Sequence, residues 1–306
     1  MLQPVHNGKN NRLKKAAAIS SVVLSIVLMF LKLYAALYTG SLAILSSLVD
    51  SVSDIFASVI TFVAVRFSSQ PATHKHRYGF GKAEALSALM QSAFIAGSGI
   101  FVIYEGINRA INPYPLTDTV LGIAIMIISM ILTVMVVAFQ QYVVRRTSSL
   151  AVGADSMHYM VDIFTNALII FSLVVVKWLH IDWFDTVGAI LVSGYLLFYA
   201  AKIANEAIGL LLDKELSAEV RGLIVDIVKK SGFCHGVHDL RTRNLGGEYI
   251  FELHLELDGD LSLYEAHCRT ELIENEIKKH YPHSQIIIHQ DPAGVEEDRL
   301  DNHLID

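Results

Sequence analysis

The chain has 306 residues, of which 53% are apolar and only 18% are charged, and its mean hydropathy is +0.46. A soluble domain usually carries about 25% charged residues, so this composition excludes an ordinary soluble protein and is typical of a membrane protein. Residues 1–212 carry 14 Lys and Arg against 10 Asp and Glu, whereas residues 213–306 carry 10 against 20 and hold eight of the 13 histidines. An acidic, histidine-rich C-terminal part argues against a nucleic-acid partner and suits cations.

Six apolar segments predict an α-helical integral membrane protein, because each is long enough to cross a hydrocarbon core of about 30 Å. They lie near residues 16–37, 41–66, 86–108, 118–141, 150–177 and 185–207. Lys and Arg gather on one side of these segments, at residues 9–15, 66–82 and 145–146, and the other side has only Arg109 and Lys177 near its loops. The positive-inside rule therefore places both termini in the cytoplasm.

From about residue 213 the pattern becomes that of a small α+β domain. Helical periodicity appears in LSAEVRGLIVDIVKKSG and LSLYEAHCRTELIENEIKKHY, and strand patterns appear in HGVHDLRTRN, YIFELHLELD and SQIIIHQDP. The order α-β-β-α-β predicts a ferredoxin-like arrangement, with helices on one face of a three-stranded sheet. We expect a cytoplasmic N-terminal segment (1–15), a six-helix transmembrane domain (16–208), a cytoplasmic domain (209–295) and a disordered acidic tail (296–306).

Ionisable residues recur at a spacing of four inside two of the apolar segments. Asp50 and Asp54 lie in the second segment, and His158 and Asp162 lie in the fifth. Residues four apart share a helix face, so two facing helices would bring three carboxylates and an imidazole together. This ligand set suits a tetrahedral divalent metal. The alternative for a single intramembrane Asp is a role in helix packing or hydrogen bonding. Asp155 lies near the start of its helix, and we assign it to a favourable interaction with the helix dipole.

Further motifs, together with these spacings, resemble the cation diffusion facilitator (CDF) family and, within it, the bacterial ferrous-iron and zinc efflux type. They are GFGKAEAL after the second segment and GVHDLRTR, HLELDG, EAH and IIIHQDP in the C-terminal part. The resemblance covers residues 12–295. It implies a homodimeric secondary transporter of the bacterial inner membrane, not an enzyme, that exports Zn²⁺, Fe²⁺ or Cd²⁺ in exchange for protons by alternating access. The transport site of the family matches Asp50, Asp54, His158 and Asp162.

The resemblance also implies a metal site in the cytoplasmic domain, where the family binds a pair of metal ions at a dimer interface. The matching residues are His238, His254, His267, His289 and Asp291. Independently of the family, His254 lies on the polar face of its strand with Glu252 and Glu256, so it is not a core histidine. We expect four other histidines to be surface residues: His235, His280, His283 and His303.

The chain departs from the family in the loop QPATHKHRYGFGKAE, where relatives often have an Asp and two His that bind a further metal. His76 matches one ligand, but Thr73 and Phe80 stand at the other two positions. His74 could substitute, although Lys75 adds a repelling charge, so we expect this loop site to be weak or absent.

The family also has an ion pair between its membrane and cytoplasmic parts, and Lys82 and Asp213 stand at the matching positions. The alternative is two interfacial charges that extend separately to water.

Chemically, carboxylates and imidazole bind either a proton or a metal, which suits exchange of one for the other. A ligand set of three oxygens and one nitrogen suits borderline metals such as Zn²⁺, Cd²⁺ and Fe²⁺. Two other classes of function stay open. An intramembrane metalloenzyme would use the metal to activate water, although the chain has no HExxH motif. A metal sensor would report cytoplasmic metal through the C-terminal domain without transport.

Overall fold

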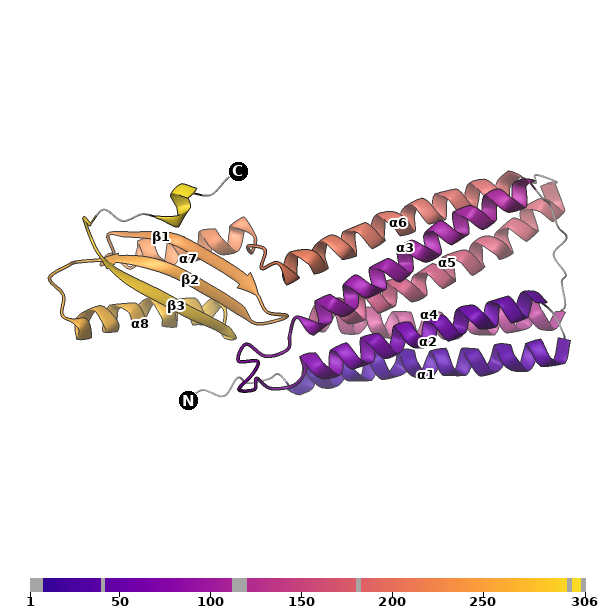
Figure 1. Cartoon of the computed structure of the whole chain (residues 1–306), viewed down its shortest axis with the longest axis horizontal. Helices are drawn as coiled ribbons and strands as arrows, with labels where there is room; N and C mark the ends of the chain where they lie inside the picture. The colour runs from indigo at the N-terminus through magenta and orange to yellow at the C-terminus, as the bar shows by residue number, and fades with distance from the viewer. Residues whose placement is uncertain (1–7, 40–41, 112–119, 180–182, 296–298, 304–306) are drawn as a thin grey trace. The chain divides into compact units, whose positions relative to one another are not determined.

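The computed structural model describes residues 8–39, 42–111, 120–179, 183–295 and 299–303 (Figure 1). At some helix ends only the backbone is described. The chain divides into two compact units, one ending at Ile208 and the other beginning at Gly209. We refer to them as the helical unit and the α/β unit.

The helical unit consists of six long helices, as the six apolar segments predict. Their bounds are α1 Gly8–Thr39, α2 Leu42–Ser68, α3 Ala83–Ile111, α4 Val120–Thr147, α5 Leu150–Leu179 and α6 Trp183–Leu211. Even the shortest of them, with 27 residues, extends about 40 Å at 1.5 Å per residue. Within the described residues, three helices contain stretches long and apolar enough to cross a membrane: Asn10–Tyr34, Ala83–Tyr104 and Ile127–Thr147.

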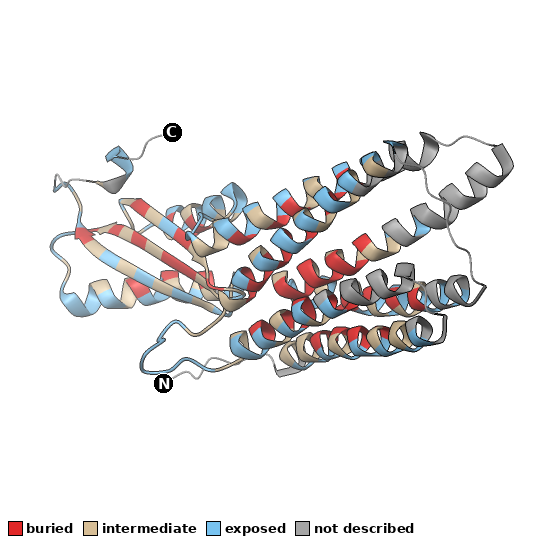
Figure 2. Ribbon diagram, turned by 45° about the vertical axis from the view of Figure 1, so that its right-hand side comes forward, coloured by how far each residue is buried: buried red, intermediate tan, exposed pale blue. Residues whose placement is uncertain are grey.

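Helix α2 packs against α1, α3 and α5, and α5 also packs against α3 and α4. Small side chains allow these helices to approach closely, because Ala17, Ala18 and Ala151 are all fully buried where α1, α2, α4 and α5 meet. Many large apolar residues of these helices are exposed, among them Phe30 and Phe56. Figure 2 shows exposed residues in pale blue along the helices. An apolar exterior of this kind is expected of helices that face lipid.

A buried ion pair connects four segments of the helical unit. Lys14 Nζ of α1 lies 2.8 Å from Glu84 Oε1 of α3, and the two side chains are only 13% and 6% exposed. Ser68 Oγ at the end of α2 donates to the same carboxylate at 3.0 Å, and Ser149 Oγ, just before α5, donates to it at 2.5 Å. Glu84 therefore joins α1, α2, α3 and the start of α5.

The α/β unit has the predicted order α-β-β-α-β. Its elements are α7 Ala218–Lys230, β1 Gly236–Asn244, β2 Tyr249–Leu257, α8 Leu263–His280 and β3 Ser284–Pro292. β2 is the central strand, antiparallel to β1 and parallel to β3. Alternate residues of β2, among them Phe251, Leu253 and Leu255, are buried in one core with Ile224 of α7 and Ile277 of α8. The opposite face of β2 is thereby left to Glu252, His254 and Glu256, as its alternation predicts.

Helix α8 begins with a capping box. Ser262 Oγ accepts from the Glu265 backbone N–H, and the Glu265 carboxylate accepts from the Ser262 backbone N–H. The Ser262 hydroxyl also donates to the Glu265 carboxylate, and this bond, together with the one from the Ser262 backbone N–H, lowers the pKa of Glu265. The start of α8 is therefore fixed by local sequence rather than by burial.

Residues 300–303, inside the stretch 296–306 that we expected to be disordered, have regular structure. Leu300–His303 form a short 3-10 helix, η1, which contacts β1 (Figure 1). Composition predicts disorder for an acidic tail, but two hydrogen bonds between Asp301 and the backbone and side chain of Asp239 hold this segment.

Candidate metal centres

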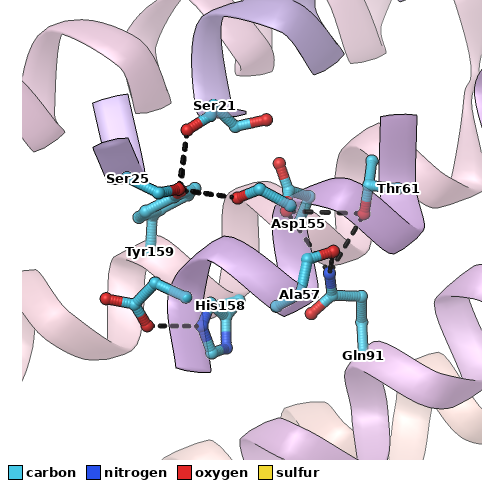
Figure 3. Close-up of polar contacts among 10 residues, drawn as sticks. Ser21, Ser25, Ala57, Thr61, Gln91, Asp155, His158 and Tyr159 are labelled. Carbon is cyan, nitrogen blue, oxygen red and sulfur yellow. Dashed lines mark hydrogen bonds and ion pairs between the residues drawn. The ribbon is translucent and has the colours of Figure 1, made fainter. Parts of the chain in front are cut away.

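In the helical unit, α2 and α5 bring together three of the four residues predicted for the transport site. His158 Nε2 lies 3.1 Å from Asp54 Oδ1 (Figure 3), and ligand atoms of Asp54, His158 and Asp162 all lie within 4.8 Å of one another. Asp54 and His158 are buried, and Asp162 is half-buried. Asp50 belongs to α2, but its side chain lies outside the described residues. The predicted juxtaposition of α2 and α5 is therefore present for Asp54, His158 and Asp162.

The residue after His158 fixes α5 against its neighbours. The Tyr159 hydroxyl is 2.6 Å from Ser25 Oγ of α1 and 2.7 Å from Ser58 Oγ of α2, and it donates to the Ser21 carbonyl at 3.1 Å. Figure 3 shows this group beside His158. Because a buried polar network restricts side-chain rotation, it holds the register in which His158 meets Asp54.

Asp155 has a different environment from the one we expected. It is the sixth residue of α5, beyond the first turn, and it is fully buried. Gln140 Nε2 donates to Asp155 Oδ2 at 2.7 Å. Gln91 Nε2 and Thr61 Oγ1 donate to Oδ1 at 3.3 and 3.4 Å (Figure 3). The assignment to the helix dipole was therefore wrong: Asp155 is a buried acceptor that connects α5 to α2, α3 and α4.

In the α/β unit, three predicted histidines form a row across the sheet. The strand register pairs His238 of β1 with His254 of β2, and His254 with His289 of β3. Paired residues project from the same face, which brings the ring centroids of His238 and His254 to 5.1 Å and those of His254 and His289 to 4.7 Å. This row lies on the sheet face opposite the helices.

Asp291 lies between these histidines and faces all three. Its Oδ2 is 2.8 Å from His254 Nδ1 and 3.4 Å from His238 Nε2, and its Oδ1 is 3.1 Å from His289 Nε2. The residue is 5% exposed. A carboxylate with one oxygen toward two imidazoles and the other toward a third suits a pair of N/O-ligated cations, so these residues fit the implied metal pair.

Two carboxylates that we did not predict complete this cluster. Asp239 Oδ2 lies 3.7 Å from His238 Nδ1, and Glu256 Oε1 lies 3.8 Å from His238 Nε2. Glu256 could have been found, since it follows His254 by two residues on the same strand face. Asp239 could not, because strict alternation would direct it away from His238. A β-bulge between His238 and Arg241, with Asp239 at φ 50°, changes that direction.

His267 is not part of the cluster within one chain. It is 62% exposed on α8, with Nε2 3.9 Å from Glu271 Oε1. The four histidines expected at the surface are exposed: His235, His280, His283 and His303.

The loop after α2 provides no comparable site. His74 and His76 are exposed, and the His76 ring lies 4.6 Å from the Phe80 ring. In the described part of the chain, neither histidine belongs to a group of three metal-ligating side chains. Lys82 and Asp213 belong to different units, so their pairing stays a prediction.

Comparison with known families is consistent with both centres. The cation efflux transmembrane domain matches residues 18–212, and the cytoplasmic domain of cation efflux proteins matches residues 216–293. The chain belongs to the cation diffusion facilitator family. This CDF protein is thus a membrane-embedded transporter for efflux of divalent metal cations, as the sequence motifs imply.

Individual relatives extend over almost the whole CDF chain. The cation-efflux pump FieF of Escherichia coli O139:H28 (strain E24377A / ETEC) is 41% identical over 289 residues, which cover 94% of this chain and 96% of the relative. FieF of Escherichia coli K12 / DH10B gives the same values. Among solved structures, the metal-bound C-terminal domain of the CzcD transporter from Thermotoga maritima is 29% identical to this chain, with a TM-score of 0.25. The match covers 26% of this chain and 93% of the chain in that structure.

Proposed function

We propose that this protein exports Zn²⁺, Fe²⁺ or Cd²⁺ from the cytoplasm in exchange for protons, and that Asp50, Asp54, His158 and Asp162 bind the transported ion. The observation that carries the proposal is the convergence of Asp54, His158 and Asp162 between α2 and α5. Ionisable side chains inside an apolar bundle are costly unless they pair with other groups or bind an ion or a proton. Three oxygens and one imidazole nitrogen match the preferences of these borderline cations.

Proton exchange follows from the ligand chemistry. A carboxylate or imidazole that carries a proton cannot ligate a metal with the same atom, so the two cations compete. Imidazole is the group that responds to small pH differences near neutrality, which makes His158 the candidate proton carrier. In an alternating-access cycle, the site binds metal when it is open to the cytoplasm and releases metal when protons enter from outside.

The membrane arrangement belongs to the same proposal. All six helices span a bacterial inner membrane, and both termini and the α/β unit lie in the cytoplasm. The support for this orientation is the clustering of Lys and Arg at the N-terminus, between α2 and α3, and at the end of α4.

We further propose a homodimer whose α/β units bind two metal ions through His238, His254, His289 and Asp291 of one chain and His267 of the other. His267 lies on α8, outside the described cluster of its own chain, and its side chain is 62% exposed, so it is accessible to a second chain. It shares a surface depression with Leu263, Tyr264 and Gln290. Leu263 is 82% exposed and Tyr264 is 76% exposed, and exposed apolar residues next to a histidine suit a protein–protein contact.

The test is transport by purified protein in liposomes, with a zinc indicator inside and a pyranine pH signal recorded in parallel. Zn²⁺ uptake that moves protons outward, and that grows with an imposed pH gradient, is the expected result. Metal flux without proton movement would refute the exchange mechanism. Absence of flux for every metal, with tight binding retained, would favour a metal sensor.

A further inference from the structure

The last described residues of the chain lie on the α/β-unit metal cluster, which no expectation from the sequence included. We refer to residues 299–303, which contain η1, as the C-terminal arm. Asp239 N–H donates to Asp301 Oδ2, and Asp301 N–H donates to Asp239 Oδ1, both at 3.0 Å. Asp239 is the bulged residue beside His238. The arm is therefore attached next to a predicted metal ligand.

Arg299 brings a positive charge to the same cluster. Its Nη2 lies 2.5 Å from Glu256 Oε1, and this carboxylate oxygen is also 3.8 Å from His238 Nε2. Glu256 is 19% exposed and stands opposite Asp291 in the β2–β3 register. A cluster that holds Asp239, Glu256 and Asp291 carries several negative charges, and Arg299 neutralises one of them. Charge-assisted pairs of this kind are among the stronger hydrogen-bonded contacts.

We propose that the C-terminal arm competes with divalent cations for the histidine cluster of the α/β unit. In this proposal, the positive charge of Arg299 compensates the carboxylates of the cluster when no metal ion is bound. This inference rests on the proposed metal site of that unit. A divalent ion beside His238 and Asp291 repels the Arg299 guanidinium, which contacts the Glu256 carboxylate of the same cluster. Ligation by Glu256 Oε1, the atom nearest His238, uses the same oxygen that Arg299 contacts, so the metal and Arg299 compete for it.

Competition of this kind is reciprocal. If the arm weakens metal binding, then metal binding must release the arm by the same factor. Coupling free energies between sites commonly correspond to about 5- to 150-fold changes in affinity. The arm thus raises the cation concentration at which the α/β unit binds metal, and it dissociates from the cluster when metal binds.

The experiment measures Zn²⁺ affinity by calorimetry on the full-length protein in detergent. All variants carry Asp54→Ala, so that the membrane site does not contribute to the signal. Arg299→Gln removes the charge, and a chain ending at Asp298 removes the whole arm. Arg221→Gln is the matched control, because Arg221 is exposed on α7 and its loss changes the net charge equally.

We expect Arg299→Gln and the shortened chain to bind Zn²⁺ at least about 5-fold more tightly, and Arg221→Gln to bind as the parent does. Hydrogen exchange gives a second measurement, since the Asp301 amide should lose protection when Zn²⁺ is added to the parent. If both arm variants bind Zn²⁺ as tightly as the parent or more weakly, while His238→Ala still impairs binding, the competition by the arm is refuted and the metal site is not. Unchanged binding by His238→Ala would refute the metal site itself, and the arm proposal with it.

Discussion

His158 Nε2 lies 3.1 Å from Asp54 Oδ1, and this contact joins α5 to α2 across 104 positions of the chain. Each helix supplies only two of the four proposed ligands, so neither helix could complete the site alone. The contact therefore makes metal binding depend on the packing of α2 against α5. That packing is determined by small and polar side chains, including Ser58 and the Tyr159 hydroxyl.

Replacing the imidazole should change which metal is transported. His158→Asp would leave a site of carboxylates only, and such sites favour Mn²⁺ over the borderline metals. We expect the ratio of Mn²⁺ to Zn²⁺ flux in liposomes to rise by about 10-fold or more. His283→Asp, which makes the same exchange at an exposed position, should leave the ratio unchanged. An unaltered ratio in His158→Asp would show that this imidazole does not select the ion.

Removal of the Asp155 carboxylate should destabilise the helical unit without removing a metal ligand. Asp155→Ala leaves the Gln140 amide and its other buried donors without their acceptor, and each unsatisfied buried group costs about 1–3 kcal/mol. Asp155→Asn keeps the shape and one acceptor, so its loss should be smaller. Thermal unfolding followed by size-exclusion chromatography measures both. Equal melting temperatures for Asp155→Ala and the parent would contradict this role.

The Lys14–Glu84 pair should behave as a coupled unit. Replacing either partner alone leaves a buried charge uncompensated, which costs about 3–5 kcal/mol. Replacing both with Met removes the uncompensated charge, so Lys14→Met/Glu84→Met should be more stable than either single variant. A double-mutant cycle of unfolding free energies checks this. Strictly additive effects would mean that the contact contributes nothing beyond its two side chains.

Asp291→Asn should impair metal binding by the α/β unit more than any single surface change. The carboxylate faces His238, His254 and His289 at once, so its neutralisation weakens both proposed ion positions. Zn²⁺ affinity in the Asp54→Ala protein should fall by at least about 10-fold, whereas His283→Ala, at an exposed position, should have no effect. Affinity equal to that of the parent would exclude Asp291 as a ligand.

Much of the fold follows from periodicity. The apolar segments predict the six helices, and alternation in YIFELHLELD predicts both the buried face of β2 and the position of the half-buried His254 on the opposite face. The four-residue spacings predict that Asp50 shares a helix face with Asp54, and His158 with Asp162, so that these side chains meet if the two helices face each other.

The remaining features depend on contacts between distant segments. Asp155 is an acceptor only because Gln91 and Gln140 reach it from other helices. Asp239 joins His238 through a bulge, which strand alternation does not predict. The arm is ordered by reciprocal bonds with Asp239, although its composition indicates disorder. In each case local sequence lacks the partner that decides the outcome.

The most direct test of the account is Zn²⁺ flux into proteoliposomes under an imposed pH gradient, measured side by side for the parent, Asp54→Ala and Asp226→Ala. The last variant removes a carboxylate from an exposed position on α7. We predict that Asp54→Ala falls to the flux of empty liposomes while Asp226→Ala matches the parent. Flux at the parental rate in correctly folded Asp54→Ala protein would contradict the assignment of the α2–α5 cluster as the transport site.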